Sequence, residues 1–396
     1  MVDGTTQQAR PARIRLGMVG GGRDAFIGGV HRMASRLDDH YELVAGAFSS
    51  TPEKSLASAV DLGVSAERAY ASFSDMAERE AAREDGIEAV SIVTPNHLHY
   101  PVACAFLERG IHVICDKPMT ASLADAKSLV EKVSASKALF VLTHNYTAYP
   151  MIRQAREMIT QGLLGDIRVI QAEYAQDWLA TKLEDSGQKQ AGWRTDPERS
   201  GMGGCIGDIG THAFNLAGFV SGLELESLCA DIQSFVPGRK LDDNANVLLR
   251  YRGGARGVLW SSQVATGNEN ALRLRIYGSQ AGIEWSQEDP NYLWFTELGK
   301  PRQLITRGGS GASEAAAGHT RIPAGHPEGY LEGFASLYAD AAEAIYAARD
   351  ARTPPSGCLY PTVHDGLAGV AFVAAVVGSS QEGGVWKSLD IPSGNG

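Results

Sequence analysis

The chain has 396 residues, 44% of them hydrophobic, which is enough for two domains and too long for one ordinary core. Its formal net charge of −10 argues against a nucleic-acid partner or an anionic membrane surface, because either requires a basic face. Five cysteines are scattered without C-x-x-C spacing, which favours free thiols in a reducing cytoplasm over disulfides or a metal site.

The two ends of the chain carry no targeting or membrane signal. Residues 1–12 are polar and lack the apolar core of a signal peptide, so a flexible tail is expected. The longest apolar stretch, 367–378, is too short and too rich in alanine and glycine to span a bilayer. It is predicted to form a buried helix of a soluble protein.

A strand beginning at residue 13 runs into a glycine-rich turn and then a helix over 26–37. Gly20, Gly22 and Ala25 match the pattern G-x-G-x-x-G/A, in which glycines let the backbone approach a pyrophosphate at a helix N-terminus. A second strand over 41–48 follows. Together these features favour a dinucleotide site that includes Phe26 at the helix start over a purely structural glycine turn.

The second strand does not end in an acidic residue, as the dinucleotide fingerprint usually does. Ser49, Ser50 and Lys54 follow it instead. An acid there would bind the 2′-hydroxyl of NAD and repel the 2′-phosphate of NADP, whereas hydroxyls and one lysine can serve either. We expect these three residues to contact the adenosine ribose. NAD is the expected cofactor, and NADP remains open.

Strands and helices then alternate regularly. Helices are predicted over 74–83, 100–109 and 123–136, and strands over 89–93, 111–115 and 139–143. This alternation is typical of a doubly wound parallel sheet, so residues 13–146 are predicted to form a Rossmann domain.

Chemistry is expected where the strand over 111–115 ends. The strand delivers Asp116 and Lys117 to the carboxyl edge of the sheet, where open α/β sheets hold their sites. Pro118 restricts Lys117 to extended conformations, so the lysine is held at that edge and is a candidate for proton chemistry. Residues that follow the neighbouring strands should share this edge, namely Asn96, His99, Asn145 and Tyr146, and Thr94 is expected to contact the cofactor.

The second half has a different pattern, with strands clustered without intervening helices. Strands are predicted over 167–174, 225–235, 245–251, 256–264, 272–277, 282–285 and 292–296, and helices over 151–161, 327–349 and 361–377. Turn sequences such as YRGGARG indicate hairpins. Residues 147–396 are therefore predicted to form an α+β domain with a largely antiparallel open sheet, including a mobile loop or cover over 308–327.

A second polar group lies within residues 200–216. Asp208 and His212 are four residues apart and share one face if this segment is helical, and Gly210 and Thr211 between them allow close approach. The plain alternative is a turn-capping aspartate and a satisfied histidine. The glycine-rich approach and the separate Lys117 favour a catalytic role.

The polar loop before this segment carries three basic residues, Lys182, Lys189 and Arg194. They form either a solvated loop, offset by Glu184 and Asp185, or a clamp for a sulfonate, phosphate or carboxylate on the substrate.

The chain resembles the Gfo/Idh/MocA family of NAD(P)-dependent oxidoreductases. The glycine fingerprint, TPNHLH, DKP, GWRTDPERSGMGG and GDIGTH occur in the family's order and spacing, across residues 13–390. Asp116 stands where the family usually has glutamate. The resemblance implies that Lys117, Asp208 and His212 are catalytic and that Asn96 and His99 lie near the nicotinamide.

The resemblance also implies substrate contacts, among which Trp193 and Arg194 match family positions. We expect substrate contacts from Asn145, Tyr146, Lys182, Lys189, Trp193, Arg194 and Thr211, and cofactor contacts that include Asp116. His212 has the residue type for a base that Asp208 orients while Lys117 polarises the substrate oxygen, or Lys117 is itself the base.

The leading hypothesis is a dehydrogenase of a sugar, polyol or glycoside. An NAD-dependent glycosidase, which oxidises a ring carbon, eliminates the aglycone, adds water and returns the hydride, shares the same site. A non-catalytic cofactor-binding regulator is disfavoured because lysine, aspartate and histidine are all present. An open sheet with an uncovered apolar face also predicts a homo-oligomer, either dimer or tetramer.

Overall fold

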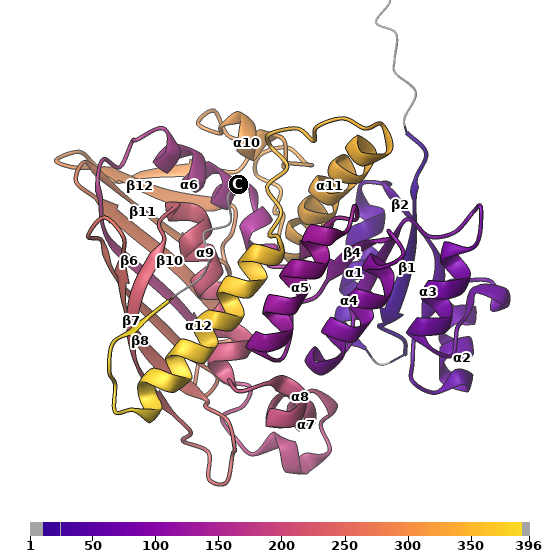
Figure 1. Cartoon of the computed structure of the whole chain (residues 1–396). Coiled ribbons are helices and arrows are strands. Elements are labelled where there is room, and N and C mark those ends of the chain that lie inside the picture. Colours follow the sequence, from indigo (N-terminus) through magenta and orange to yellow (C-terminus); the bar gives the residue numbers. More distant parts are fainter. Residues whose placement is uncertain (1–10, 24, 390–396) are drawn as a thin grey trace, which may run out of the picture.

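The computed structural model describes residues 11–23 and 25–389, so the predicted N-terminal tail lies almost wholly outside the described residues. Two sheets organise the chain (Figure 1). The first belongs to the N-terminal part and the second, larger sheet to the C-terminal part, with α12 lying diagonally across the front of the view.

The N-terminal part is a five-stranded parallel sheet of order β2-β1-β3-β4-β5, which confirms the predicted doubly wound fold. Its strands are β1 (Ile14–Gly20), β2 (Tyr41–Ala47), β3 (Ala89–Val93), β4 (His112–Cys115) and β5 (Phe140–Leu142). Its helices are α1 (Phe26–Leu37), α2 (Pro52–Leu62), α3 (Phe73–Ala81), α4 (His99–Leu107) and α5 (Leu123–Ala135). Near-continuous burial of β3 and β4 reflects helices on both faces.

The second sheet has nine strands in the order β13-β12-β11-β10-β6-β9-β8-β7-β14. They are β6 (Ile167–Ala175), β7 (Leu225–Gln233), β8 (Asn244–Tyr251), β9 (Arg256–Ser262), β10 (Ala271–Gly278), β11 (Ala281–Ser286), β12 (Tyr292–Glu297), β13 (Gln303–Thr306) and β14 (Lys387–Ser388). All pairs are antiparallel except β6 with β9, so the predicted largely antiparallel sheet is confirmed.

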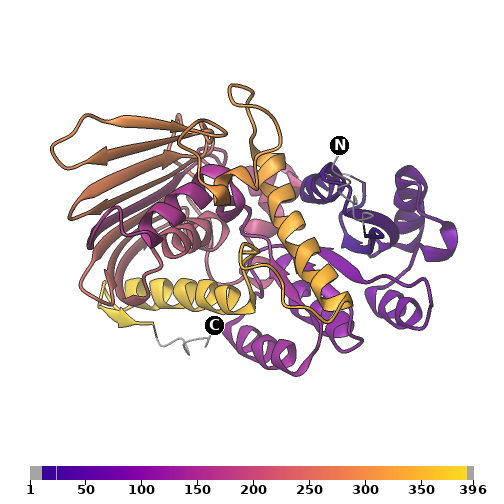
Figure 2. The same cartoon turned by 90° about the horizontal axis from the view of Figure 1, so that it is seen from above.

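Helices cover the second sheet on one face only. Those that pack on its strands are α6 (Pro150–Thr160), α9 (Thr211–Ser221) and α12 (Val363–Gln381). The C-terminal part also contains α7 (Lys189–Arg194), α8 (Pro197–Ser200), α10 (Glu314–Ala317) and α11 (Tyr330–Arg349). Figure 2 shows helices on the inner face of this sheet and none on the outer face. Helix α10 lies within the segment that the sequence predicted to be a loop.

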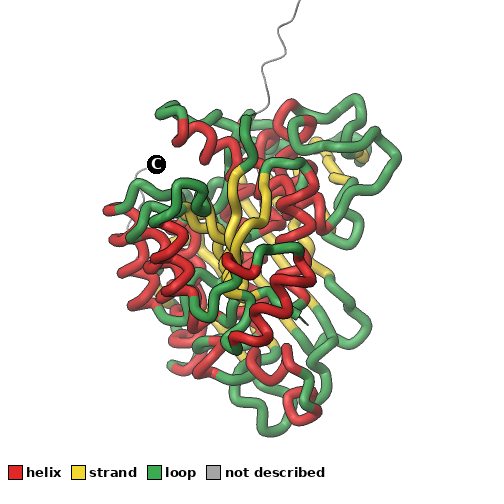
Figure 3. The backbone as a smooth tube through the Cα atoms, turned by 90° about the vertical axis from the view of Figure 1, so that its right-hand side faces the viewer, coloured by secondary structure: helices red, strands yellow, loops and turns green. Residues whose placement is uncertain are grey.

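The last two long helices join the two parts of the molecule. Helix α11 packs against α1, and the tube in Figure 3 shows the helices gathered around the strands. Helix α12 packs against α5 of the first part and against α9 and β7 of the second. By length and composition α12 could cross a membrane, but it packs against elements of both parts of the fold, as a core helix does.

Candidate active site

The turn after β1 can only be formed by glycines. Gly20 has a φ of +82°, a conformation that glycine adopts without strain. A Cβ on Gly22 would lie 2.7 Å from the backbone oxygen of Phe48. Since a side chain has no space there, the backbone itself forms the surface that a ligand would meet.

The start of α1 suits a phosphate group. A Cβ on Gly28 would lie 2.3 Å from the Cα of Gly21, so the helix approaches the turn as closely as backbone allows. Helix α1 begins at Phe26, and Ala25 provides no side-chain cap, so the first N–H groups are left to a ligand. The turn and the helix start therefore fit the pyrophosphate of a dinucleotide.

The residues predicted to contact the ribose lie where β2 ends and α2 begins. The Ser49 hydroxyl accepts a hydrogen bond from the Thr51 N–H at 3.2 Å, and Ser50 and Lys54 are exposed. Their contact with a ribose stays a prediction.

The segment after β3 contacts both the loop after β4 and the second domain. The Asn96 amide donates to the Ser200 carbonyl oxygen at 2.9 Å, across the two parts of the molecule. Both ring nitrogens of the buried His99 face backbone carbonyls, those of Pro118 at 2.6 Å and Thr94 at 2.9 Å. The His99 ring therefore joins two loops in this structure, whereas the enclosed Thr94 hydroxyl has no described partner.

Asp116 lies beside a buried polar network that the sequence did not reveal. Its carboxylate accepts a hydrogen bond from the Thr143 hydroxyl at 2.9 Å and lies 4.0 Å from Nε2 of His31. Nδ1 of His31 contacts the Tyr338 hydroxyl at 2.8 Å, and Tyr338 in turn contacts the Ser91 hydroxyl. This network connects α1, β3 and α11 to Asp116, the residue that precedes Lys117.

Lys117 and Asp208 meet, as predicted, although they come from different domains. The Lys117 ammonium donates to the Asp208 carboxylate at 2.9 Å and to the Asp208 backbone oxygen at 2.5 Å. Gln263 donates to the other carboxylate oxygen at 2.9 Å, and Arg194 lies 3.3 Å from it. Burial raises the pKa of Asp208, but Lys117 and Arg194 outweigh burial and hold the pKa below its usual range.

A π-helical turn, Ile206–Gly210, presents Asp208. Such turns are rare and occur often at functional sites. The buried Asp242 carboxylate accepts hydrogen bonds from two backbone N–H groups at the start of the turn, which fixes its position. Thr211 follows the turn, and its hydroxyl faces α12 at Gly369.

His212 is 8% exposed and lies against histidine and tyrosine rings. Its Nδ1 is 3.4 Å from Nδ1 of His144, and the ring of Tyr146 packs edge-on at 4.9 Å. Burial, together with Lys117, lowers the pKa of His212 well below its usual value, so the imidazole is neutral and one ring nitrogen has a lone pair. The described hydrogen bonds of the Asp208 carboxylate go to Lys117 and Gln263 and not to His212.

A chain of hydrogen bonds extends from Tyr146 into the second sheet. The Tyr146 hydroxyl contacts the Tyr174 hydroxyl at 2.6 Å, and Tyr174 donates to Asn270 at 2.8 Å. Asn145 is buried, and its amide nitrogen is without a partner among the described residues. The sequence predicted Asn145 and Tyr146, but it gave no signal for Tyr174 or Asn270, which lie on strands remote in sequence.

One of the residues predicted on the polar loop lies beside the catalytic group. Arg194 reaches Asp208, and its guanidinium lies 4.4 Å over the ring of Trp193. Lys182 pairs with Asp185 at 3.0 Å and has no described contact with the catalytic group. The side chain of Lys189 lies outside the described part of the structure.

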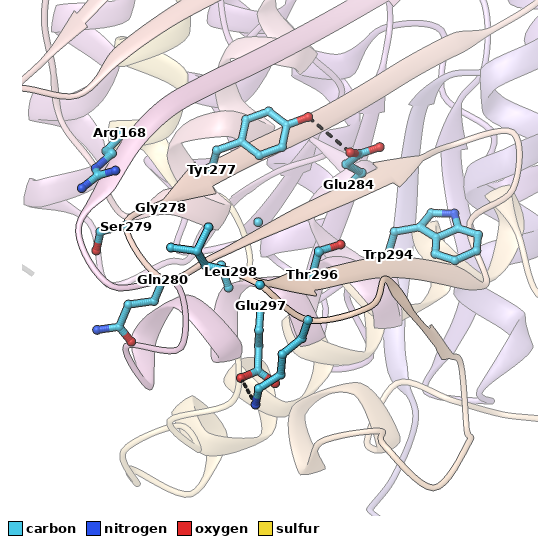
Figure 4. Close-up of a pocket in the computed structure, with 14 residues that line it drawn as sticks. Arg168, Tyr277, Gly278, Ser279, Gln280, Glu284, Trp294, Thr296, Glu297 and Leu298 are labelled. Atoms are coloured by element: carbon cyan, nitrogen blue, oxygen red, sulfur yellow. Dashed lines mark hydrogen bonds and ion pairs between the residues drawn. The ribbon is translucent and has the colours of Figure 1, made fainter.

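The larger of two described hollows lies away from these residues. It has a volume of about 410 Å³ and lies on the outer face of the second sheet. Figure 4 shows Arg168, Tyr277, Glu284 and Trp294 around it. A smaller hollow of about 30 Å³ adjoins Pro118 and is of single-water size. Helix α9, which carries His212, packs on the opposite face of the sheet, so the larger hollow is not part of the catalytic group.

A dinucleotide-binding sheet whose carboxyl edge meets a lysine, a carboxylate and a histidine defines an NAD-dependent oxidoreductase. Two family models match the chain: "Oxidoreductase family, NAD-binding Rossmann fold" over residues 14–144, and "GFO/IDH/MocA C-terminal domain" over residues 152–284. The chain belongs to the Gfo/Idh/MocA family, whose relatives include NAD-dependent sugar and polyol dehydrogenases.

Individual relatives agree with this assignment. The uncharacterized oxidoreductase YfiI of Bacillus subtilis is 36% identical over 98% of this chain and 99% of its own. An oxidoreductase from Sinorhizobium meliloti is 58% identical, with a TM-score of 0.88 over 95% of this chain and 100% of its own.

An inositol dehydrogenase homolog from Azotobacter vinelandii has been solved in two complexes. The complex with NAD+ is 39% identical to this chain, with a TM-score of 0.92 over 98% of this chain and 100% of its own. The complex with NADH and myo-inositol is 38% identical, with a TM-score of 0.89 over 95% of this chain and 97% of its own.

Proposed function

We propose that the protein oxidises a secondary hydroxyl on the ring of a cyclitol or sugar, with Lys117, Asp208 and His212 as the catalytic group. The supporting observation is the direct contact of Lys117 with Asp208 across the two domains, beside a neutral buried His212. The myo-inositol complex of the Azotobacter vinelandii relative supports the substrate class.

The donors on Lys117 suit a substrate oxygen. An ammonium group has three N–H donors, and two of them go to Asp208, which leaves one for the substrate hydroxyl. This donor stabilises negative charge on the oxygen as the proton departs. His212 takes that proton as general base. Bound NAD would supply the hydride acceptor, held at the glycine turn and the start of α1.

Arg194 is the proposed contact for any anionic substituent on the substrate. Its Nε lies 3.3 Å from the Asp208 carboxylate as an ion pair but outside hydrogen-bond geometry, so the N–H is enclosed without a hydrogen-bond acceptor among the described residues. Lys182, already paired with Asp185, is left out of this proposal.

We propose that the protein is located in a reducing cytoplasm, where its five free cysteines would persist. We also propose that it forms a homo-oligomer in which a second copy covers the outer face of the second sheet. The face exposes apolar side chains, with Leu248 50% and Val258 43% exposed. It also carries Glu173 between Arg273 and Arg275. Because both charge signs and apolar groups are present, a second copy related by two-fold symmetry is a complementary partner.

A substrate screen tests the proposed activity. The purified protein would be offered NAD with cyclitols, pyranoses and glycosides, each with and without an anionic substituent, while NADH and released aglycone are followed. NADH formation with a cyclitol or sugar is the expected result. Aglycone release without net NADH would indicate a glycosidase instead, and NAD binding without turnover of any compound would indicate a regulator.

A further inference from the structure

A second histidine, His144, lies against His212 inside the proposed catalytic group. His144 follows β5, so the edge of the Rossmann sheet provides it, whereas His212 comes from α9 of the other domain. Their rings are perpendicular, at 87°, with centroids 5.2 Å apart, and the two Nδ1 atoms are 3.4 Å apart. Both side chains are buried, so water does not replace this contact.

Two neutral imidazoles that meet through Nδ1 must have different tautomers. One Nδ1 carries a hydrogen and donates, and the other presents its lone pair and accepts. If His212 is the donor, its proton is on Nδ1 and its Nε2 has the lone pair. In that arrangement Nε2 of His212 is a base.

Burial and the neighbouring Lys117 ammonium keep both rings neutral. Burial, together with Lys117, lowers the pKa of His144 to about 3 and that of His212 well below its usual value. The ionisable groups that face His212 are Lys117 after β4, His144 after β5, Asp208 on the π-helical turn, Tyr146, and Tyr174 on β6.

Asp208 does not provide the orienting contact that the sequence suggested. One carboxylate oxygen accepts from Lys117, and the other faces Gln263 and Arg194. The described hydrogen-bonding contact of the His212 ring is with His144.

We propose that His144 is a positioning residue that holds His212 in the tautomer with hydrogen on Nδ1, leaving Nε2 to accept the substrate proton. This inference rests on the proposed function. In the oxidation, the hydroxyl proton moves to Nε2 of His212 and the hydride leaves the carbon for NAD. The imidazolium that forms still donates its Nδ1–H to Nδ1 of His144, which keeps its own proton on Nε2 throughout.

Two substitutions of His144 separate positioning from packing. His144→Phe keeps an aromatic ring in the buried site but removes the acceptor. His144→Asn places its amide oxygen near the former Nδ1 and so restores an acceptor. We expect His144→Phe to lower kcat by about 100-fold, the lower end of what a general base contributes, with unchanged affinity for NAD. His144→Asn should recover most of the loss, and His364→Phe, at an exposed position on α12, should have no effect.

Nitrogen NMR of histidine-labelled wild-type protein with NAD bound provides a readout that is independent of turnover and does not require His144→Phe to fold. The spectrum should show His212 protonated on Nδ1 in the wild-type protein, with its signal assigned by its loss in His212→Asn. Protonation on Nε2 would overturn the inference. Wild-type kcat in His144→Phe, with His212→Asn inactive, would also overturn it and leave the proposed function standing. Full activity in His212→Asn would instead refute the proposed base.

Discussion

At the scale of single residues, Lys117 has the clearest expected effect on turnover. Lys117→Met removes the donor to the substrate oxygen and leaves the Asp208 carboxylate with Gln263 and Arg194. We expect kcat to fall by about two to four orders of magnitude, with NAD affinity nearly intact by calorimetry. Lys182→Met is the matched control, because Lys182 pairs only with the exposed Asp185 in the described contacts.

The same measurement of kcat can contradict the assignment of the whole catalytic site. Full activity in both Lys117→Met and His212→Asn would show that the chemistry lies elsewhere.

Buried neutral histidines also make stability depend on pH. Burial lowers the pKa of His31 to about 4, below the value of about 6.5 for an unfolded histidine. Between these values the unfolded chain binds a proton that the folded chain does not, so stability is fully present above pH 6.5 or so and declines toward about pH 4. His31→Asn keeps an acceptor for Tyr338 and removes the titrating group. It should therefore reduce the slope of the unfolding free energy against pH by up to about 1.4 kcal/mol per pH unit, the effect of one proton.

Urea-unfolding free energies over a pH series measure this slope. His364→Asn is the control, since His364 is exposed on α12 and should leave the slope unchanged. An unaltered slope in His31→Asn would mean that His31 is protonated in the folded protein, or that folding does not shift its pKa.

At the scale of elements, the β1–α1 turn determines cofactor binding. In Gly22→Leu the new side chain would begin 2.7 Å from the Phe48 backbone oxygen, so the turn must move or the pyrophosphate surface is filled. We expect NAD binding measured by calorimetry to be abolished. Gly29→Ala is the control within α1, because its nearest neighbour would be 3.9 Å away. Unchanged NAD affinity in Gly22→Leu would place the cofactor elsewhere.

Elements with a strongly apolar face could be predicted from the sequence, whereas α2 could not. The buried face of α2 consists of Ser55, Ser58 and Ala59, so no apolar periodicity marks it. The π-helical turn at Ile206–Gly210 was expected as an ordinary helix, because sequence spacing does not separate the two geometries.

The catalytic site likewise has parts that could be predicted from the sequence and parts that could not. Lys117 could be predicted because the carboxyl edge of a parallel sheet follows from strand order alone. The contacts of Asp208 with Gln263 and Arg194 could not, because they depend on how the polar loop and the end of β9 pack around the π-helical turn. His144 was overlooked for a similar reason, since only the packing of α9 brings His212 to it.

At the scale of the whole molecule, the outer face of the second sheet predicts the oligomeric state. Leu248 and Val258 are directly opposite each other on β8 and β9. Changing them together to Leu248→Glu and Val258→Lys puts a charge pair within one protomer, so the fold is kept while an apolar contact between copies is lost. We expect light scattering after size exclusion to show an oligomer for the wild type and a monomer for the double variant.

The control for this experiment is Leu163→Glu, at a 44% exposed position in the turn after α6 and away from the sheet face. A monomeric wild-type protein, or a double variant that remains oligomeric, would contradict the proposed interface.

Helix α11 packs on the Rossmann sheet although it lies near the end of the chain, and this order affects folding during translation. Ile14 and Leu16 of β1 share a buried cluster with Phe334, Leu337 and Tyr338 of α11, which the ribosome adds long after the sheet strands. While the middle of the chain is being translated, one side of the first sheet therefore has α1 but lacks the rest of its cover, and presents apolar surface to water or to a chaperone. The domain that is synthesised first cannot complete its folding until nearly the last helix has emerged.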